Sequence, residues 1–442
     1  MKQIFNKYLV QITILLSAVI LVWVSANLKW GDERWNRIVY DDARGLYAYL
    51  PAIFIYQDLS FSYFEDKIEA PFNQDNLFYY KNKDHNNGII NKYYIGTSMA
   101  IMPFFLLGHL ISWIVGNPLD GYSAYYLIFI QVATIFYALL GQYLLIRILI
   151  HYQISKKIIA LVIFSAIFAT NIFYYVTNEP GMSHVYSFAF VTLFAYNAIR
   201  FFNKPGKLPF ISAMFALGMV ILIRPVNVLI LLSIPFLSGD QQRLKAGFIY
   251  LFKKIWMLVI GSCITIGIIF IQLIIYKIQT GDFIVYSYSG EGFDFTDPNI
   301  LNFILSYRKG LLVYTPVFFV SILGLFIIYK RKPFEFFNLV LFLLIVVYVL
   351  SSWWMWYYGG SFGSRAFIEY YVFLFIPLAM WLEEGKLKKL FRWLVVAFIL
   401  ICQIQTYQYQ YGYLHWSEMT KELYWDNFLR IDKVINDEEK EW

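Results

Sequence analysis

The sequence predicts an all-α, polytopic membrane protein, and three observations support that class. Hydrophobic residues make up 60% of the 442 residues and charged residues only 15%, whereas a soluble domain is about half apolar and about a quarter charged. Apolar runs of about 17–25 residues, the length of a membrane-spanning helix, recur along the chain. Strands are not expected within lipid, because an open sheet edge leaves backbone groups there without hydrogen-bond partners.

The net charge of +7 fits this class without a nucleic-acid partner. Lys and Arg gather in short segments between the apolar runs, which is the pattern that keeps basic loops in the cytoplasm. The two cysteines, Cys263 and Cys402, lie within apolar runs and have no metal-ligand spacing. We therefore interpret both as packing residues.

About eleven spans are predicted from these runs, with the amino end inside and the carboxyl end outside. The runs are 9–27, 122–147, 158–177, 183–199, 208–223, 226–238, 255–276, 311–329, 334–352, 366–382 and 393–411. The run 94–115 is interpreted as a juxtamembrane or partly inserted helix, because the loop before it is already outside. The alternative is that this run crosses and that one of the charge signals misleads.

The chain divides into three predicted parts. Residues 1–240 form a first membrane module with a large external loop at 28–93, and loops of such length are usually functional. In that loop, 43–57 suits a helix at the membrane interface and 58–90 a polar excursion. Residues 241–411 form a second membrane module, and 412–442 a polar external tail. No internal repeat is visible, so an inverted-repeat transporter is not indicated.

Two adjacent carboxylates after the first span are the strongest candidate site. Asp41 and Asp42 point in different directions, whatever the local structure. One can face a substrate as a general base, while the other pairs with Arg44 or binds a hard divalent cation, for which Asp42 and Glu179 are the candidate ligands. The alternative is a solvated loop start with a local salt bridge.

Further polar groups are predicted to reach the same outer face. Lys92 and Arg224 are cations suited to a phosphate group, and Arg224 interrupts an apolar run just before a proline. The alternative for Lys92 is a residue whose ammonium extends to the interface. Glu179 ends a run and can position an acceptor, bind a metal or pair with Lys92, and His184 follows it. Charges beside membrane spans are costly, so the prediction that all of these groups lie on the same side of the membrane indicates function.

The segment 353–365 has the most unusual composition in the chain. Aromatic faces stack on sugar rings, and the candidates for such contacts are Trp353, Trp354, Trp356 and Tyr357. The alternative is an aromatic belt at the membrane interface. Arg365 ends the segment and is expected to pair with Glu369, one helical turn on. The tail after 403, rich in Tyr, Gln, His and Trp, is a second candidate to cap a carbohydrate groove.

On these residues the chain resembles the GT-C superfamily of membrane glycosyltransferases, as a bacterial member close to the protein O-mannosyltransferase and lipid A aminoarabinose transferase branch. That branch carries an acidic motif followed by Arg and Tyr after its first span, which here reads Asp41-Asp42-Ala43-Arg44 with Tyr47 displaced. Its lysine before a Pro-Pro-Leu helix corresponds to Lys92, although 93–95 lack the prolines. Its later acidic residue before proline corresponds to Glu179, and its basic residue after an outward-running helix to Arg224.

The resemblance implies inverting transfer of a sugar from a polyprenyl-phosphate donor to a lipid, glycan or protein acceptor, at the periplasmic face of the bacterial inner membrane. Asp41 is then the base or acceptor-orienting carboxylate, helped by Asp42 or Glu179. The implied donor-phosphate ligands are Arg44, Lys92, Arg224 and Arg365, and the implied sugar or acceptor contacts are His184 and the four aromatic residues of 353–357. A divalent cation is the one cofactor expected. The competing interpretation is a non-catalytic transporter or flippase of lipid-linked saccharides, and the few charges within mid-span count against it.

Overall fold

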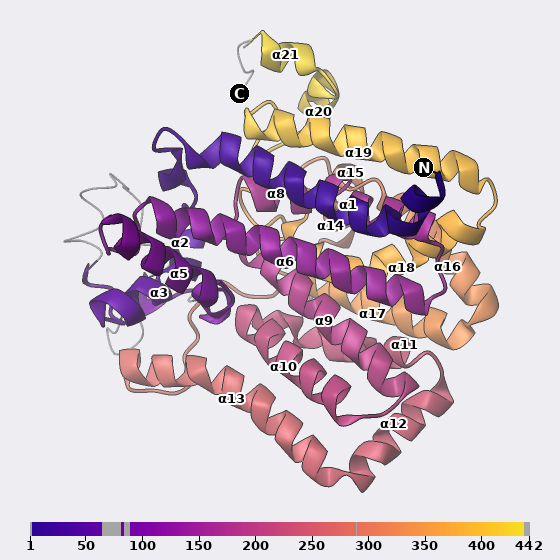
Figure 1. Ribbon diagram of the computed structural model, residues 1–442, viewed down its shortest axis with the longest axis horizontal. Helices are drawn as coiled ribbons and strands as arrows, with labels where there is room; N and C mark the ends of the chain where they lie inside the picture. The colour runs from indigo at the N-terminus through magenta and orange to yellow at the C-terminus, as the bar shows by residue number, and fades with distance from the viewer. Residues whose placement is uncertain (1, 64–80, 84–88, 289, 437–442) are drawn as a thin grey trace.

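The computed structural model describes residues 2–63, 81–83, 89–288 and 290–436. Within them, eight helices are long and apolar enough to cross a membrane. They lie largely side by side in Figure 1, which confirms a membrane-embedded, helical protein. The eight are α1 (Lys2–Ser25) with η1 (Ala26–Trp30), α5 (Gly96–Val115), α6 (Ala124–His151), α9 (Ser183–Asn203), α13 (Ile255–Thr280), α17 (Pro333–Ser351), η7 (Arg365–Tyr370) continued by α18 (Tyr371–Glu384), and α19 (Lys388–Gln410).

The count of about eleven spans is not confirmed, because four of the predicted runs form shorter helices. They are α7 (Lys156–Phe168), α8 (Ile172–Thr177), α10 (Lys207–Ile223), η6 (Pro225–Ser233), α11 (Ile234–Ser238), α15 (Leu311–Tyr314) and α16 (Phe318–Arg331). Prolines at 225, 235 and 316 explain several of the breaks, since proline lacks the N–H that a helix interior needs. Conversely α5, predicted not to cross, has the length and composition of a span, which favours the alternative for 94–115.

The break between α7 and α8 occurs at a buried polar side chain. Asn171 donates from Nδ2 to the carbonyl oxygen of Phe362 at 2.8 Å and accepts from the Tyr371 hydroxyl at 2.8 Å. A buried amide must find such partners, and both come from segments about two hundred residues away. These hydrogen bonds therefore hold the end of the run 158–177 against α18 and against residues 353–365, called the aromatic segment below.

The loop after α1, predicted to be external, consists of short elements. Its helices are η2 (Arg34–Arg37), α2 (Asp42–Tyr47), α3 (Tyr49–Pro51) and η3 (Ala52–Tyr56), so the predicted interfacial helix at 43–57 is helical but segmented. Two antiparallel strands, β1 (Lys81–Lys83) and β2 (Ile89–Asn91), lie in this loop, outside the segments that could span lipid. Much of the excursion predicted at 58–90 lies outside the described residues.

Four further helices connect or follow the helices named above. They are α12 (Gln241–Lys253), α14 (Ile300–Leu305), α20 (Lys421–Asn427) and α21 (Ile431–Ile435). Figure 1 draws α20 and α21 beyond α19, at the edge of the helical array.

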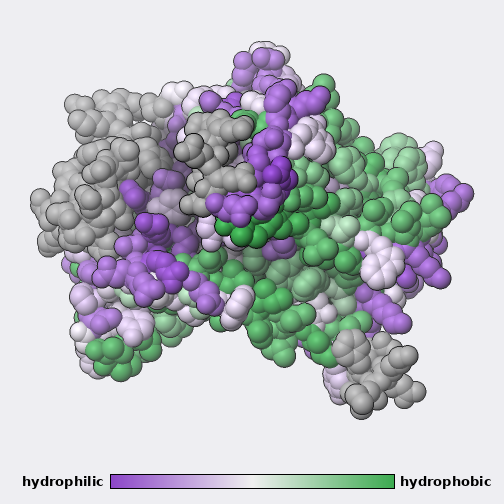
Figure 2. Space-filling view, turned by 90° about the horizontal axis from the view of Figure 1, so that it is seen from above, coloured by the Kyte–Doolittle hydropathy of each residue, from purple (hydrophilic) through white to green (hydrophobic). Residues whose placement is uncertain are grey.

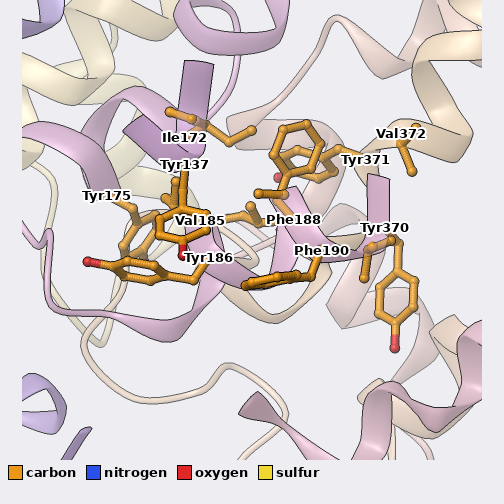
Figure 3. Close-up of a cluster of buried hydrophobic side chains, with 14 of the residues drawn as sticks. Tyr137, Ile172, Tyr175, Val185, Tyr186, Phe188, Phe190, Tyr370, Tyr371 and Val372 are labelled. Atoms are coloured by element: carbon orange, nitrogen blue, oxygen red, sulfur yellow. The ribbon is translucent and has the colours of Figure 1, made fainter. Parts of the chain in front are cut away.

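The core is centred on α9, which is buried on nearly every side. Figure 3 shows its Val185, Tyr186, Phe188 and Phe190 among side chains from α6, α8, η7 and α18. A helix that is apolar all round is one that other helices surround. The outer helices α1, α13 and α19 instead expose much of their apolar surface. Figure 2 shows apolar side chains over a broad area of one face, an arrangement that lipid stabilises and water does not.

Candidate functional site

A cavity of about 550 Å³ lies where α2, the α8–α9 turn, the end of α10 and the aromatic segment meet. Clefts of this size bind small ligands when a few polar groups converge in them. The structure brings most of the predicted residues into its wall: Asp41, Asp42, Lys92, Glu179, His184, Arg224, Trp353, Trp354 and Arg365. Arg44, Trp356 and Tyr357 are not part of this wall.

Asp41 is the acid of the cavity that is available to interact with a ligand. Its backbone has φ 48° and ψ −133°, a conformation that side-chain-bearing residues rarely adopt and that accumulates at functional sites. Its side chain lines the cavity and has no hydrogen-bond or ion-pair partner in the described part of the chain. Partial burial and then the charge of Asp42 raise its pKa above the ordinary aspartate value. Asp41 is thus free to take a proton from a bound molecule.

Asp42 is held in place on both oxygens. The Tyr93 hydroxyl donates to Oδ1 at 2.6 Å, and Arg365 Nη2 lies 2.7 Å from Oδ2. Burial raises the pKa of Asp42, but the Arg365 charge and these hydrogen bonds outweigh it, so that the pKa is lowered overall. The two adjacent acids are therefore differentiated, with Asp42 kept ionised and Asp41 kept free.

Two predicted pairings are wrong. Asp42 pairs with Arg365 rather than with Arg44, which lies two residues on in α2 and is not among the residues that line the cavity. Arg365 in turn does not pair with Glu369, because that carboxylate binds Arg224. The prediction that Arg44 binds a donor phosphate has no support in this geometry.

Glu179 is a second acid without a cationic partner in the part of the chain that the structure describes. Its Oε1 accepts from the Tyr174 hydroxyl at 2.9 Å and the Tyr40 hydroxyl at 3.2 Å, and burial is the main cause that raises its pKa. The predicted pairing with Lys92 is wrong, since Lys92 forms an ion pair with Glu291 and lies 5.1 Å from the Tyr288 ring centroid. Sequence reasoning had placed Glu291 in an outer loop without giving it a role.

A close backbone approach brings Glu179 to the two aspartates. Gly181 follows Glu179 in the turn before α9, and a Cβ at this position would lie 2.5 Å from the Cβ of Ala43 in α2. Real Cβ atoms essentially never come so close. Glycine at 181 therefore allows the α8–α9 turn to pack directly on the helix that begins at Asp42.

Arg224 and His184 share one buried carboxylate. Glu369 Oε1 accepts from Arg224 Nη1 at 2.7 Å and lies 3.2 Å from His184 Nδ1, and the Glu369 side chain is 0% exposed. Arg224 also lies 5.7 Å from the ring centroid of Tyr358. Sequence reasoning named Glu369 only as the partner of Arg365. The available signal was a carboxylate within an apolar run, which is costly in a membrane and therefore functional by default.

The cations of the cavity are paired, whereas two of its acids are not paired with any described residue. Lys92, Arg224 and Arg365 each form an ion pair with one carboxylate, whereas Asp41 and Glu179 form none among the described residues. Each arginine ion pair uses a single guanidinium nitrogen, and arginine has five N–H donors. The guanidinium groups are thereby fixed in place and retain donors for an anion.

The predicted metal ligands already have other partners. Asp42 is bonded on both oxygens, and Glu179 Oε1 accepts from two tyrosines. Over the described ranges, no group of three or more His, Cys, Asp and Glu is placed to hold a metal ion. A hard cation needs several oxygen ligands, so no step below is assigned to a metal.

The aromatic segment is only partly a cavity wall. Trp353 and Trp354 line the cavity, and Trp354 is 52% exposed. Tyr357 instead lies beneath the Arg308 guanidinium, whose carbon is 3.4 Å from the ring centroid, and Trp356 packs edge-on against Tyr357. The predicted sugar contacts of Trp356 and Tyr357 stay predictions, and this cavity does not include either side chain in its wall; Tyr357 instead makes a cation–π contact with Arg308.

No protein-family model matches this chain, and no curated protein matches it. Fold and site define a class on their own: a helical, membrane-embedded protein with a charged and aromatic cavity that is lined by loops and helix ends.

The contact between the turn and α2 predicts that Gly181→Ala lowers stability by about 1–3 kcal/mol, because the new methyl group overpacks against Ala43. Ala43→Gly alone costs about 1 kcal/mol in a helix. The double variant should be more stable than Gly181→Ala alone, since it removes the clash. Thermal unfolding of the purified protein in detergent measures all three variants, and strictly additive losses would contradict the contact.

The shared carboxylate predicts that Glu369→Gln destabilises the protein by about 3–5 kcal/mol, because it leaves Arg224, whose side chain is only 19% exposed, without its counter-charge. The matched control is Glu384→Gln, which breaks the surface pair with Arg331 and costs at most about 1 kcal/mol. The same unfolding measurement compares them. Equal losses of stability in the two variants would show that Glu369 contributes no more than a surface ion pair does.

Proposed function

We propose that this protein is an integral-membrane glycosyltransferase that moves a sugar from a polyprenyl-phosphate donor to a hydroxyl or amine of a lipid, glycan or protein acceptor. The observation that carries the proposal is the conformationally strained Asp41, which has no ion pair with any described residue and shares one cavity with three fixed cations. The resemblance to the GT-C superfamily noted from the sequence agrees with it.

In the proposed reaction Asp41 is the general base. It accepts the proton of the acceptor hydroxyl as the oxygen attacks the anomeric carbon of the donor sugar, and the bond from that carbon to the phosphate oxygen breaks. A positioned base of this kind must be within hydrogen-bond reach and must be unprotonated. The free carboxylate of Asp41 supports this role, and Asp42 supports it indirectly by holding Arg365 beside it.

The leaving group is a polyprenyl phosphate, which departs with the bonding electron pair. Arg224, Lys92 and Arg365 are the candidates to stabilise its developing charge. Because their carboxylate partners hold them in place, little reorganisation accompanies the reaction, and preorganised charge is the most effective kind. Glu179, with its raised pKa, is the candidate to orient the acceptor by a hydrogen bond.

The distribution of basic residues supports a periplasmic site. The helices α9 and α18 begin at the cavity and end at basic clusters, 204–207 and 386–392. The helices α10 and α17 run the other way, from 204–207 and 330–332 toward the cavity. Basic loops favour the cytoplasm, so the cavity belongs to the opposite side, which is the periplasm for a bacterial inner-membrane protein.

Asp41→Asn should abolish transfer, with a loss of about 10²–10⁴-fold, because the amide cannot accept the proton. The assay measures labelled sugar released from undecaprenyl-phosphate-linked hexoses and pentoses by proteoliposomes. The control is Asp32→Asn, an aspartate of the same loop whose side chain is 89% exposed. Full transfer by Asp41→Asn would reject Asp41 as the base, and no turnover with any lipid-linked donor would reject the transferase and favour the transporter or flippase.

The pH dependence of transfer follows from the raised pKa of Asp41. The base works only when ionised, so activity is present above this pKa and is lost as the pH falls through it. The acidic limb of the rate profile should therefore lie above 3.8, the ordinary value for aspartate. Rates of transfer at saturating donor, from acid to neutral pH, test this. An acidic limb at or below the ordinary value would assign the proton to another group.

A further inference from the structure

The chain after α19 returns to the cavity and adds a residue to its wall. Trp416 lines the cavity, and its side chain is 61% exposed. It lies against the aromatic segment, where a Cβ on Gly360 would be 3.0 Å from Trp416 Cε3. That distance is tighter than nine in ten real Cβ contacts. Glycine at 360 therefore lets the indole approach the backbone of the loop closely.

A buried lysine joins the two segments behind this wall. Lys309 is only 2% exposed, and its ammonium donates to the carbonyl oxygens of Ser361 and, at 2.6 Å, of Trp416. It forms no ion pair with any residue that the structure describes. A buried ammonium is costly without partners, and burial lowers the pKa of Lys309 to about 7. Its hydrogen bonds therefore hold the tail and the aromatic segment together.

The neighbouring Arg308 makes a second connection between the same segments. Its Nε donates to the carbonyl oxygen of Ser417 at 2.7 Å, and its guanidinium stacks on the ring of Tyr357. Two adjacent cations thus fix both the residue after Trp416 and the loop that faces it. As a result Trp416 is exposed to the cavity yet held at a set position, which is the state of a binding residue and not of a loosely attached surface side chain.

The surroundings of Trp416 select the chemistry of its ligand. Trp256 on α13 and Trp393 on α19 are 76% and 74% exposed on outer apolar helices, where lipid covers them. Trp416 instead shares a cavity with carboxylates and cations. A sugar ring matches this combination, because it offers an apolar C–H face to an indole and hydroxyl groups to charged neighbours.

We propose that Trp416, with Gly360 and the exposed Trp354, forms a subsite that stacks on a sugar ring, and that Arg308 and Lys309 position it. The proposal rests on the proposed function, since it names carbohydrate as the ligand of the same cavity. It also assigns a role to the polar tail: the tail completes the binding site.

Binding of methyl glycosides tests the subsite without any transfer. The probes are the methyl α- and β-pyranosides of mannose, glucose and galactose, titrated against the purified full chain by saturation-transfer NMR. Trp416→Ala should weaken the best-bound probe about three- to tenfold, the loss of one aromatic contact, and Trp416→Phe should retain most of the affinity. The control is Trp425→Ala, a 54% exposed tryptophan of the same tail that lies outside the cavity wall.

The outcomes separate this inference from the transferase. Glycoside binding that depends on Trp416, in a protein that transfers no sugar, supports the subsite and rejects only the reaction. Equal affinities of wild type and Trp416→Ala overturn the subsite even if transfer is observed, and so does the absence of glycoside binding by the wild type. A Trp416→Ala loss confined to decyl phosphate, used as a lipid probe, also overturns it, because the indole then contacts a lipid chain.

Discussion

One ion pair joins the two halves of the chain at the site. Asp42 and Arg365 are 323 residues apart, and their side chains meet at 2.7 Å. The pair connects the loop after the first helix to the aromatic segment before α18, and Tyr93 completes the coordination of the carboxylate. Because a pair of this kind loses its solvation, it persists only where other hydrogen bonds fix both partners. The relative placement of the cavity walls depends on this contact.

Around that pair, most charged side chains of the cavity form ion pairs with one another. Each of the three cations of the cavity faces a carboxylate, and Asp41 and Glu179 have no ion pair within the described ranges. The pKa values of Asp41 and Glu179 are raised, with burial as the first cause in both, whereas the pKa of the adjacent Asp42 is lowered. An environment that separates neighbouring acids into fixed anions and proton acceptors is the usual basis of acid–base chemistry at neutral pH.

The outer and the inner helices of the molecule are under different physical constraints. The outer helices meet lipid and need only be apolar, so their sequences carry long hydrophobic runs with little else. The inner helices α9 and η7–α18 are largely surrounded by protein, and their starts at Ser183 and Arg365 bring polar groups to the cavity. Breaks in the short helices also place polar side chains, since Asn171 precedes α8 and Arg224 follows α10.

The membrane class, the long helices and most of the cavity wall followed from the sequence. Apolar length identifies a spanning helix because lipid imposes it, and a charge at the end of an apolar run is conspicuous because it is expensive. Asp41, Lys92, Glu179, Arg224 and Arg365 could each be singled out in this way. Helix breaks inside apolar runs were harder to predict from the sequence. At Asn171, for example, the hydrogen-bond partners come from distant segments.

Only the tertiary structure decided which charges meet. Local spacing suggested Arg44 for Asp42 and Glu369 for Arg365, but each acid bonds to a cation from another part of the chain. Hydrogen bonds and ion pairs act over about 3 Å, and helix packing sets those distances between segments that are far apart in sequence. Composition and periodicity determine what a side chain can do in a membrane; its actual partner is determined by how the helices come together.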